Sequence, residues 1–228
     1  RLIREYLKEY KPDAKTLEKV FQLNSRYDTQ VNGEDAGLRN VEWSLKKMEW
    51  GNLFNYGEKN SINFDKLNGV VGVFGKNFSG KSSVVDSALY TIYNSISKNN
   101  RKNLNIINQN KDAGYGRVEI DIDGKTYIIE RKTEKYMKKL HGEETPEAKT
   151  DVEFTMIDPA TGVETSLNSL DRNGTDKEIR RIFGSIDDFL LTSMSSQMGA
   201  MTFINEGSTR RKEILAKFLD LDQFEKKF

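Results

Sequence analysis

A glycine-rich segment carries the clearest chemistry in this chain. Residues 75–82 read G-K-N-F-S-G-K-S, which satisfies the phosphate-binding pattern G-x-x-x-x-G-K-[ST]. Glycine permits backbone angles that a Cβ penalises, so we expect Gly75 and Gly80 to let successive N–H groups turn toward an anion. Lys81 supplies a positive charge for the β- and γ-phosphates of a nucleotide, and the Ser82 hydroxyl is the expected Mg²⁺ ligand.

The flanking residues predict the strand–loop–helix setting that this pattern requires. Residues 69–74 form a short apolar run that suits a buried strand, and residues 83–93 place apolar side chains on one helical face. The helix start adds its positive dipole end and free N–H groups, and Ser83 either donates to the α-phosphate or caps the helix. We therefore predict an ATP site with Mg²⁺. Its nucleotide-binding residues are Gly75, Lys76, Asn77, Phe78, Ser79, Gly80, Lys81, Ser82 and Ser83.

Composition restricts the remaining chemistry. The 228 residues include no cysteine and one histidine, which excludes cysteine-based metal sites and disfavours histidine clusters and Ser-His-Asp triads. That histidine, His141, lies in a charged stretch and is expected in a solvated loop. A formal net charge of +1 gives no overall argument for nucleic acid, so any such surface must be local. No apolar run approaches the ~18 residues of a membrane span, and we expect a cytoplasmic or nucleoid protein.

Three segments are expected along the chain. Residues 1–40 form a helical lead-in, whose second helix starts near Leu17, is short, and is followed by a loop over residues 31–40. Residues 41–207 form the nucleotide-binding lobe. Residues 208–228 form an amphipathic helix that continues to the last residue. Because the chain does not begin with methionine, we expect it to be an excerpt of a longer protein.

Within the central lobe, the pattern changes from strands to helices. Turn residues Asp123 and Gly124 separate two alternating apolar runs, which predicts a hairpin. Thr175 and Ser185 precede amphipathic runs and are the predicted helix caps, and Ser208 precedes a third, long amphipathic run. The strands are expected at residues 43–50, 61–65, 69–74, 115–121, 125–130, 152–157 and 163–167, with a turn at residues 53–57.

In this order, the elements resemble the amino-terminal half of an SMC-like DNA-repair ATPase. The type is the SbcC and Rad-class ATPase subunit of double-strand-break nuclease complexes, including phage recombination-endonuclease subunits. The resemblance spans Trp43 to Phe228 and implies an α/β fold, a P-loop ABC-type ATPase head. Its amino-terminal lobe would combine a mixed or antiparallel β-subdomain with a helical segment that leads into a coiled coil from Leu219. It rests on L-F-N-Y-G and S-I-N-F before the phosphate loop, on G-R-V-E-I-D-I-D-G-K-T-Y-I-I-E-R, and on L-L-T-S-M-S-S-Q-M-G-A-M-T-F-I with S-T-R-R-K-E-I-L-A-K-F-L-D-L-D-Q-F.

The resemblance also implies site residues and absences. Gln197 in S-S-Q-M matches the family glutamine that reaches Mg²⁺ and the attacking water, a role that suits an amide. Asn77 would lie near the γ-phosphate. Phe54 stands where many relatives carry arginine, so we expect no arginine contact from that turn. The sequence holds no L-S-G-G-Q-like signature loop and no apolar strand ending in Asp-Glu. We therefore expect weak ATP binding and poor hydrolysis unless the carboxy-terminal half is present.

The implied partners are the chain's own carboxy-terminal lobe, a second head in an ATP-dependent homodimer, an SbcD-type nuclease subunit, and DNA bound without sequence preference. Phosphate contacts from basic clusters would give salt-dependent DNA binding. An acidic stretch at residues 142–147 follows the second cluster, which favours a solvated, mobile hairpin tip over a DNA contact for that cluster. The clusters comprise Lys98, Arg101 and Lys102, and Arg131, Lys132, Lys135, Lys138 and Lys139.

Three alternatives share the phosphate loop. A chromosome-maintenance or gap-repair ATPase of the RecF or RecN kind would act without a nuclease. A transporter nucleotide-binding domain is disfavoured because 116 residues separate Lys81 from Gln197, a longer insert than that class carries. A small-molecule kinase needs lid arginines close to a compact core, which the long strand-rich insert disfavours.

Overall fold

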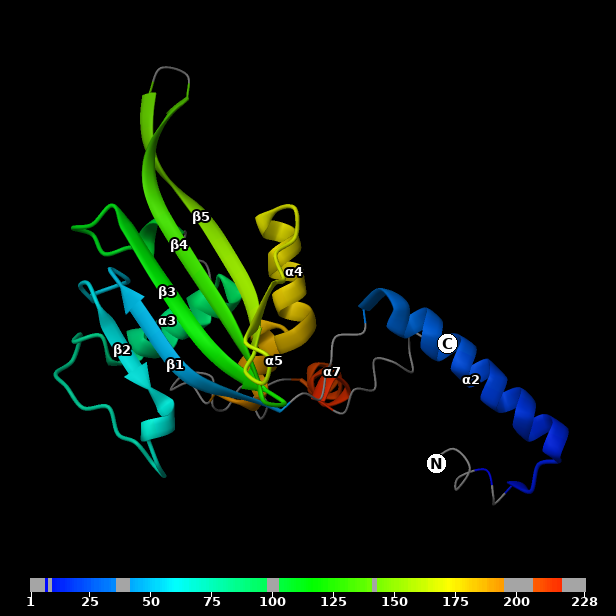
Figure 1. The fold of residues 1–228 in the computed structure, drawn as a ribbon. Coiled ribbons are helices and arrows are strands. Elements are labelled where there is room, and N and C mark those ends of the chain that lie inside the picture. Colours follow the sequence, from blue (N-terminus) through cyan, green and yellow to red (C-terminus); the bar gives the residue numbers. More distant parts are fainter. Residues whose placement is uncertain are drawn as a thin grey trace. The chain divides into compact units, whose positions relative to one another are not determined.

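A six-stranded sheet organises the larger of two compact units. The computed structural model describes residues 7, 10–35, 42–97, 103–140, 143–194 and 207–218, and the unit with the sheet is Leu38–Thr202. The strand order is β2-β1-β3-β4-β5-β6, and every neighbouring pair is antiparallel (Figure 1). The strands are β1 (Trp43–Gly51), β2 (Asn60–Asn63), β3 (Ala113–Ile122), β4 (Lys125–Leu140), β5 (Glu143–Asp158) and β6 (Val163–Ser166).

Helices cover one face of this sheet and close the core. Helix α3 (Lys81–Tyr93) packs on β3 and β4, and α4 (Arg172–Phe183) packs on β5 and on α3. In Figure 1, α3 lies behind the sheet and α4 beside β5. The unit also contains α5 (Ile186–Thr192) and the 3-10 helices η2 (Phe64–Lys66) and η3 (Asn103–Asn105). Buried core residues come from both layers: Met48, Trp50, Leu89, Tyr90, Ile92, Val118, Ile120, Ile129, Phe154, Ile179 and Phe183.

The predicted hairpin is confirmed, but its second strand is much longer than expected. Strand β3 pairs with β4 around a turn in which Asp123 and Gly124 have φ of 50° and 77°, the conformation that favours this dipeptide. The β3 pairing stops at Glu134, whereas β4 pairs with β5 up to Leu140 and Glu143. Strands β4 and β5 therefore continue past the rest of the sheet as a two-stranded ribbon (Figure 1).

The strand predicted at residues 69–74 is wrong for this structure. The segment has no strand conformation, and the side chains of Val70 and Phe74 are 104% and 93% exposed. A strand is stable only when neighbouring strands take up its N–H and C=O groups. No described strand pairs with this segment, so its apolar, β-branched residues alone do not make it a strand within the described residues.

One predicted cap also needs correction. Asp171, not Thr175, is the N-cap of α4, because its carboxylate accepts a hydrogen bond from the N–H of Gly174 at 2.7 Å. Thr175 lies inside the first turn, where its hydroxyl donates to the Asp171 carbonyl at 3.1 Å. Glycine in this turn disguises the helix start in the sequence.

The smaller unit comprises Arg1–Gly37 and Phe203–Phe228 and contains α2 (Ala14–Asp35) and α7 (Ser208–Phe218). The prediction of a short second helix and of a loop from residue 31 is wrong, since α2 has 22 residues. Asn24 breaks the apolar face, but no glycine or proline lies between Ala14 and Gly33 to stop the helix. Asp13 starts it by accepting the N–H of Thr16, and this hydrogen bond lowers the pKa of the carboxyl group. None of the helices described is long and apolar enough to span a membrane.

Candidate nucleotide-binding site

The phosphate loop, residues 75–82, and the first turn of α3 face an open pocket with a volume of about 830 Å³. Asn77, Phe78 and Gly80 line it from the loop, and Lys81, Ser82 and Ser83 line it from the helix. Six of the nine predicted nucleotide-binding residues thus share one cavity at a helix N-terminus, where free N–H groups and the helix dipole favour an anion.

The two glycines of the loop have different physical roles. Gly80 is left-handed with φ of 91°, as a phosphate-binding turn requires. Gly75 does not adopt a positive φ. A Cβ there would lie 2.7 Å from the Ser79 hydroxyl, so this glycine provides space rather than an unusual backbone angle. Phe78 is left-handed with φ of 63° although it carries a bulky side chain, which is 98% exposed at the pocket.

Lys81 holds its ammonium group against the start of the loop. The Nζ atom donates hydrogen bonds to the carbonyl oxygens of Gly75 and Lys76 at 2.8 and 2.7 Å. The N–H of Ser79 also donates to the Lys76 carbonyl, at 3.2 Å. Gly75, Lys76 and Ser79 do not line the pocket, and they contribute instead to the internal bonding of the loop. The positive charge is thereby positioned beside the cavity in which phosphates are expected.

Two further walls of the pocket were not predicted as site residues. One is the upstream turn, residues 52–57, which contributes Phe54 and Asn55. The other is the amide-rich loop, residues 103–110, in which five of eight residues are Asn or Gln. Amide side chains both donate and accept, which suits the polar edges of a base or a ribose. The high density of amide side chains in residues 103–110 was the sequence signal that could have identified this wall of the pocket. The lining residues from this loop are Asn105, Ile107, Asn108, Gln109 and Asn110.

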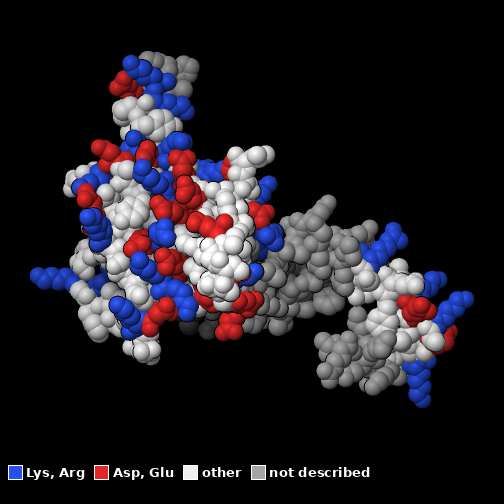
Figure 2. Space-filling model, in the orientation of Figure 1, with Lys and Arg blue, Asp and Glu red and all other residues white. Residues whose placement is uncertain are grey.

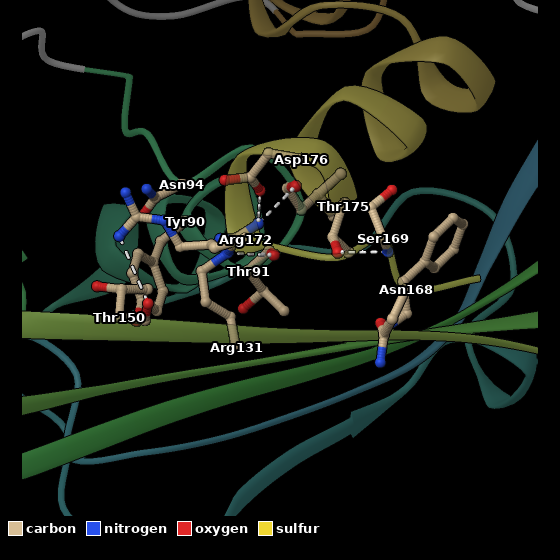
Figure 3. A network of polar contacts seen from close by, with 12 residues as sticks. Tyr90, Thr91, Asn94, Arg131, Thr150, Asn168, Ser169, Arg172, Thr175 and Asp176 are labelled. Carbon is tan, nitrogen blue, oxygen red and sulfur yellow. Dashed lines mark hydrogen bonds and ion pairs between the residues drawn. The ribbon is translucent and has the colours of Figure 1, made fainter. Parts of the chain in front are cut away.

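A fully buried arginine fixes the opposite end of α3. Arg131 on β4 donates to the carbonyls of Thr91 and Ile92 at 3.0 and 3.4 Å and pairs with Asp176 of α4 at 2.6 Å (Figure 3). The side chain is 0% exposed. Its charge stabilises the negative end of the helix whose positive end faces the pocket. Arg131 is therefore unavailable to DNA, which corrects its assignment to a basic cluster.

The other members of that cluster are engaged within the ribbon and its neighbours. Lys132, Lys138 and Lys139 form ion pairs with Glu134, Glu147 and Glu144 at 2.6, 3.4 and 3.2 Å. The Lys135 ammonium group donates instead to backbone carbonyls of the amide-rich loop. The partners neutralise much of the local positive charge, so the ribbon offers a weaker attraction to phosphates than its lysine count suggests. The basic cluster at residues 98–102 lies outside the described residues.

The open face of the sheet is a mosaic of both charges. Arg117 lies among three carboxylates, with distances of 3.8 Å to Glu49, 3.5 Å to Glu119 and 3.4 Å to Glu130. Figure 2 shows Lys and Arg side chains interspersed with Asp and Glu over this face. A mixed face of this kind does not concentrate the positive potential that DNA phosphates need. Gln197, the other predicted catalytic residue, lies outside the described residues, as does the predicted start of the coiled coil.

Comparison with known proteins identifies the family to which this pocket belongs. A family model described as AAA domain matches residues 47–228. The chain belongs to this AAA-domain family. The match begins within β1, includes the phosphate loop and extends through the sheet and the helices that follow, which confirms the predicted α/β P-loop class.

The relatives agree with the SMC-like resemblance. The chain is 27% identical over 238 aligned residues to an uncharacterised protein of Acanthamoeba polyphaga mimivirus, covering 98% of this chain and 17% of that protein. It is 26% identical to the SbcC component of the nuclease SbcCD of Clostridium acetobutylicum, and the alignment covers 75% of this chain and 14% of that protein. It is 25% identical to the DNA double-strand break repair Rad50 ATPase of Methanocaldococcus jannaschii, and the alignment covers 80% of this chain and 16% of that protein. The chain thus spans about a sixth of the length of these relatives. The predicted likeness to SbcC- and Rad50-class ATPases is confirmed.

Proposed function

We propose that this chain is the ATP-binding amino-terminal lobe of a DNA double-strand-break repair and recombination ATPase. The observation that carries the proposal is the phosphate loop beside a pocket of about 830 Å³ at the start of α3. That volume accommodates a nucleoside triphosphate, since ligand pockets measure about 300 to 1,000 Å³. Membership of the AAA-domain family supports the ATPase assignment.

The proposed roles follow the chemistry of the lining residues. Lys81 binds the β- and γ-phosphates, and the Ser82 hydroxyl coordinates Mg²⁺. The remaining loop residues supply backbone N–H groups, and Asn77 reaches the γ-phosphate. Gln197 completes the metal site and orients the attacking water. The amide-rich loop accommodates the nucleoside.

Residues beyond this lobe complete catalysis in this proposal. The exposed apolar run at residues 69–74 is not a strand here and has no strand partner within the described residues. We propose that the carboxy-terminal half of the protein supplies neighbouring strands for it, together with the signature loop and the Walker B strand, the apolar strand that ends in Asp-Glu. ATP then joins two such heads into a homodimer, and the dimer controls the access of a partner nuclease to DNA. The names of two relatives, a nuclease component and a double-strand break repair ATPase, support this direction.

The experiment uses the full-length protein and its Lys81→Ala variant. We expect Mg-ATP to shift the wild type from monomer to dimer in sedimentation, DNA to stimulate its hydrolysis, and the variant to lose both responses. Hydrolysis that is unchanged in the variant would overturn the phosphate-loop assignment. DNA-stimulated hydrolysis without any response to an SbcD-type nuclease would instead favour a RecF- or RecN-like ATPase, and hydrolysis without any response to DNA would favour an ATPase outside DNA repair.

A further inference from the structure

The phosphate loop can present its N–H groups to an anion only if its carbonyl groups are turned away and bonded elsewhere. Two of these carbonyls are bound by consecutive residues of the upstream turn. The side-chain amide of Asn55 donates to the Phe78 carbonyl at 3.0 Å, and the Tyr56 hydroxyl donates to the Gly80 carbonyl at 3.0 Å. Both carbonyls belong to left-handed residues, with φ of 63° and 91°.

We propose that Asn55 and Tyr56 form a carbonyl clamp that positions the phosphate loop for the triphosphate. They are positioning residues, because they act through the loop backbone rather than on the reacting atoms. This inference rests on the proposed ATP-binding function and adds to it the residues that hold the cradle open. Phe78 depends on the clamp most, since a bulky residue at positive φ costs about 1 to 3 kcal/mol and persists only where its surroundings hold it.

The clamp is preorganised by its own packing. The upstream turn closes on itself, with the Asn52 N–H donating to the Gly57 carbonyl and the Tyr56 N–H to the Leu53 carbonyl, each at 2.9 Å. Leu53 is fully buried. The ring of Tyr56 packs edge-on against Trp50, with ring centres 5.2 Å apart. The hydroxyl is therefore aimed by a packed ring, whereas Asn55 is exposed and its hydrogen bond is open to competition from water.

The same turn is tied to the amide-rich loop, which forms the opposite wall. Asn108 donates its N–H to the Asn52 carbonyl at 2.9 Å and its side-chain amide to the Tyr56 carbonyl at 3.1 Å. Lys135 of β4 donates to the Asn108 carbonyl at 3.2 Å. One set of hydrogen bonds thus fixes the clamp relative to both walls. Burial also raises the pKa of the Tyr56 hydroxyl, which extends the pH range in which it stays protonated and can donate.

Tyr56→Phe isolates the clamp because it removes one hydroxyl and keeps the packed ring. Tyr136→Phe is the matched control: it removes a hydroxyl that bonds to Glu147 on the ribbon, away from the pocket. In the full-length protein, calorimetric titration would measure the Kd values of Mg-ATP and of inorganic tripolyphosphate at a temperature where every variant is folded. We expect Tyr56→Phe to weaken both ligands by the same factor, about 5- to 10-fold, with Tyr136→Phe unchanged. Asn55→Ala should weaken both by about 2- to 5-fold.

The thermal midpoint separates positioning from structure. We expect the unfolding temperature of Tyr56→Phe to match that of Tyr136→Phe, while its KM for ATP rises. Unchanged Kd values for both ligands, or weakening of ATP alone, would overturn the clamp, because the latter outcome assigns Tyr56 to the nucleoside. Lys81→Ala separates a failure of the proposed clamp from a failure of the proposed ATP-binding function. If that variant loses ATP and Tyr56→Phe does not, only the clamp fails; if Lys81→Ala binds ATP normally, the proposed function fails as well.

Discussion

The buried pair between Arg131 and Asp176 is expected to couple the sheet, α3 and α4 energetically. Removing one member of a buried ion pair leaves an uncompensated charge and costs about 3 to 5 kcal/mol. Arg131→Met should reach about 4 to 6 kcal/mol, because the Thr91 and Ile92 carbonyls also lose their charged donor. Asp176→Asn keeps an acceptor oxygen near the guanidinium group and should cost about 3 kcal/mol.

The double variant is the informative one. With both charges removed, no unpaired ion remains, so we expect its cost to fall short of the sum of the single variants by about 2 to 3 kcal/mol. Urea unfolding measures these values through the fluorescence of Trp50, which is 3% exposed, and of Trp43, which packs on Phe189. The exposed pair of Lys139 and Glu144 is the control, with an expected coupling below about 1 kcal/mol. Additive costs at the buried pair, within about 0.5 kcal/mol, would refute this reasoning.

Three further variants test the packing around α3 and α4. Gly116→Ala would place a Cβ in steric conflict with the Thr91 hydroxyl, and we expect urea unfolding to show a loss of about 2 to 3 kcal/mol from the overpacked contact. Asp171→Ala removes the α4 cap and should cost about 1 kcal/mol by the same measurement; no loss would exclude that cap. Burial raises the pKa of Tyr90 from 10.0 to about 12, so its contribution is complete below pH 10 and is lost as pH rises through 12. The difference amounts to about 3 kcal/mol, and Tyr90→Phe should remove this alkaline destabilisation from stability curves measured between about pH 9 and 12.

Local signals in the sequence predicted the elements that depend on local chemistry. The phosphate loop follows from the glycine, lysine and serine positions within residues 75–82, and α3 follows from its apolar period. The β3–β4 hairpin follows from Asp123-Gly124 between alternating runs. The apolar character of residues 69–74 was also recognised correctly, but a strand depends on partners that the sequence near it does not provide.

Features that depend on distant residues escaped prediction. The pocket walls at residues 52–57 and 103–110 converge on the phosphate loop only through tertiary packing. Arg131 was interpreted as a surface charge because lysines surround it in the sequence, although the alternation of β4 turns it toward α3. The ribbon was missed because its charged residues follow no apolar pattern, and cross-strand ion pairs stabilise it instead.

Equilibrium titration of the full-length protein with Mg-ATP, before and after Lys81→Ala, tests the central claim most directly. Lys81 is the charge that the loop positions beside the pocket, with its ammonium group held by the Gly75 and Lys76 carbonyls. We predict that Lys81→Ala weakens Mg-ATP at least about 10-fold, while Lys66→Ala in η2 leaves the affinity unchanged. Equal affinity of the Lys81→Ala variant and the wild type would contradict the assignment of this pocket to ATP.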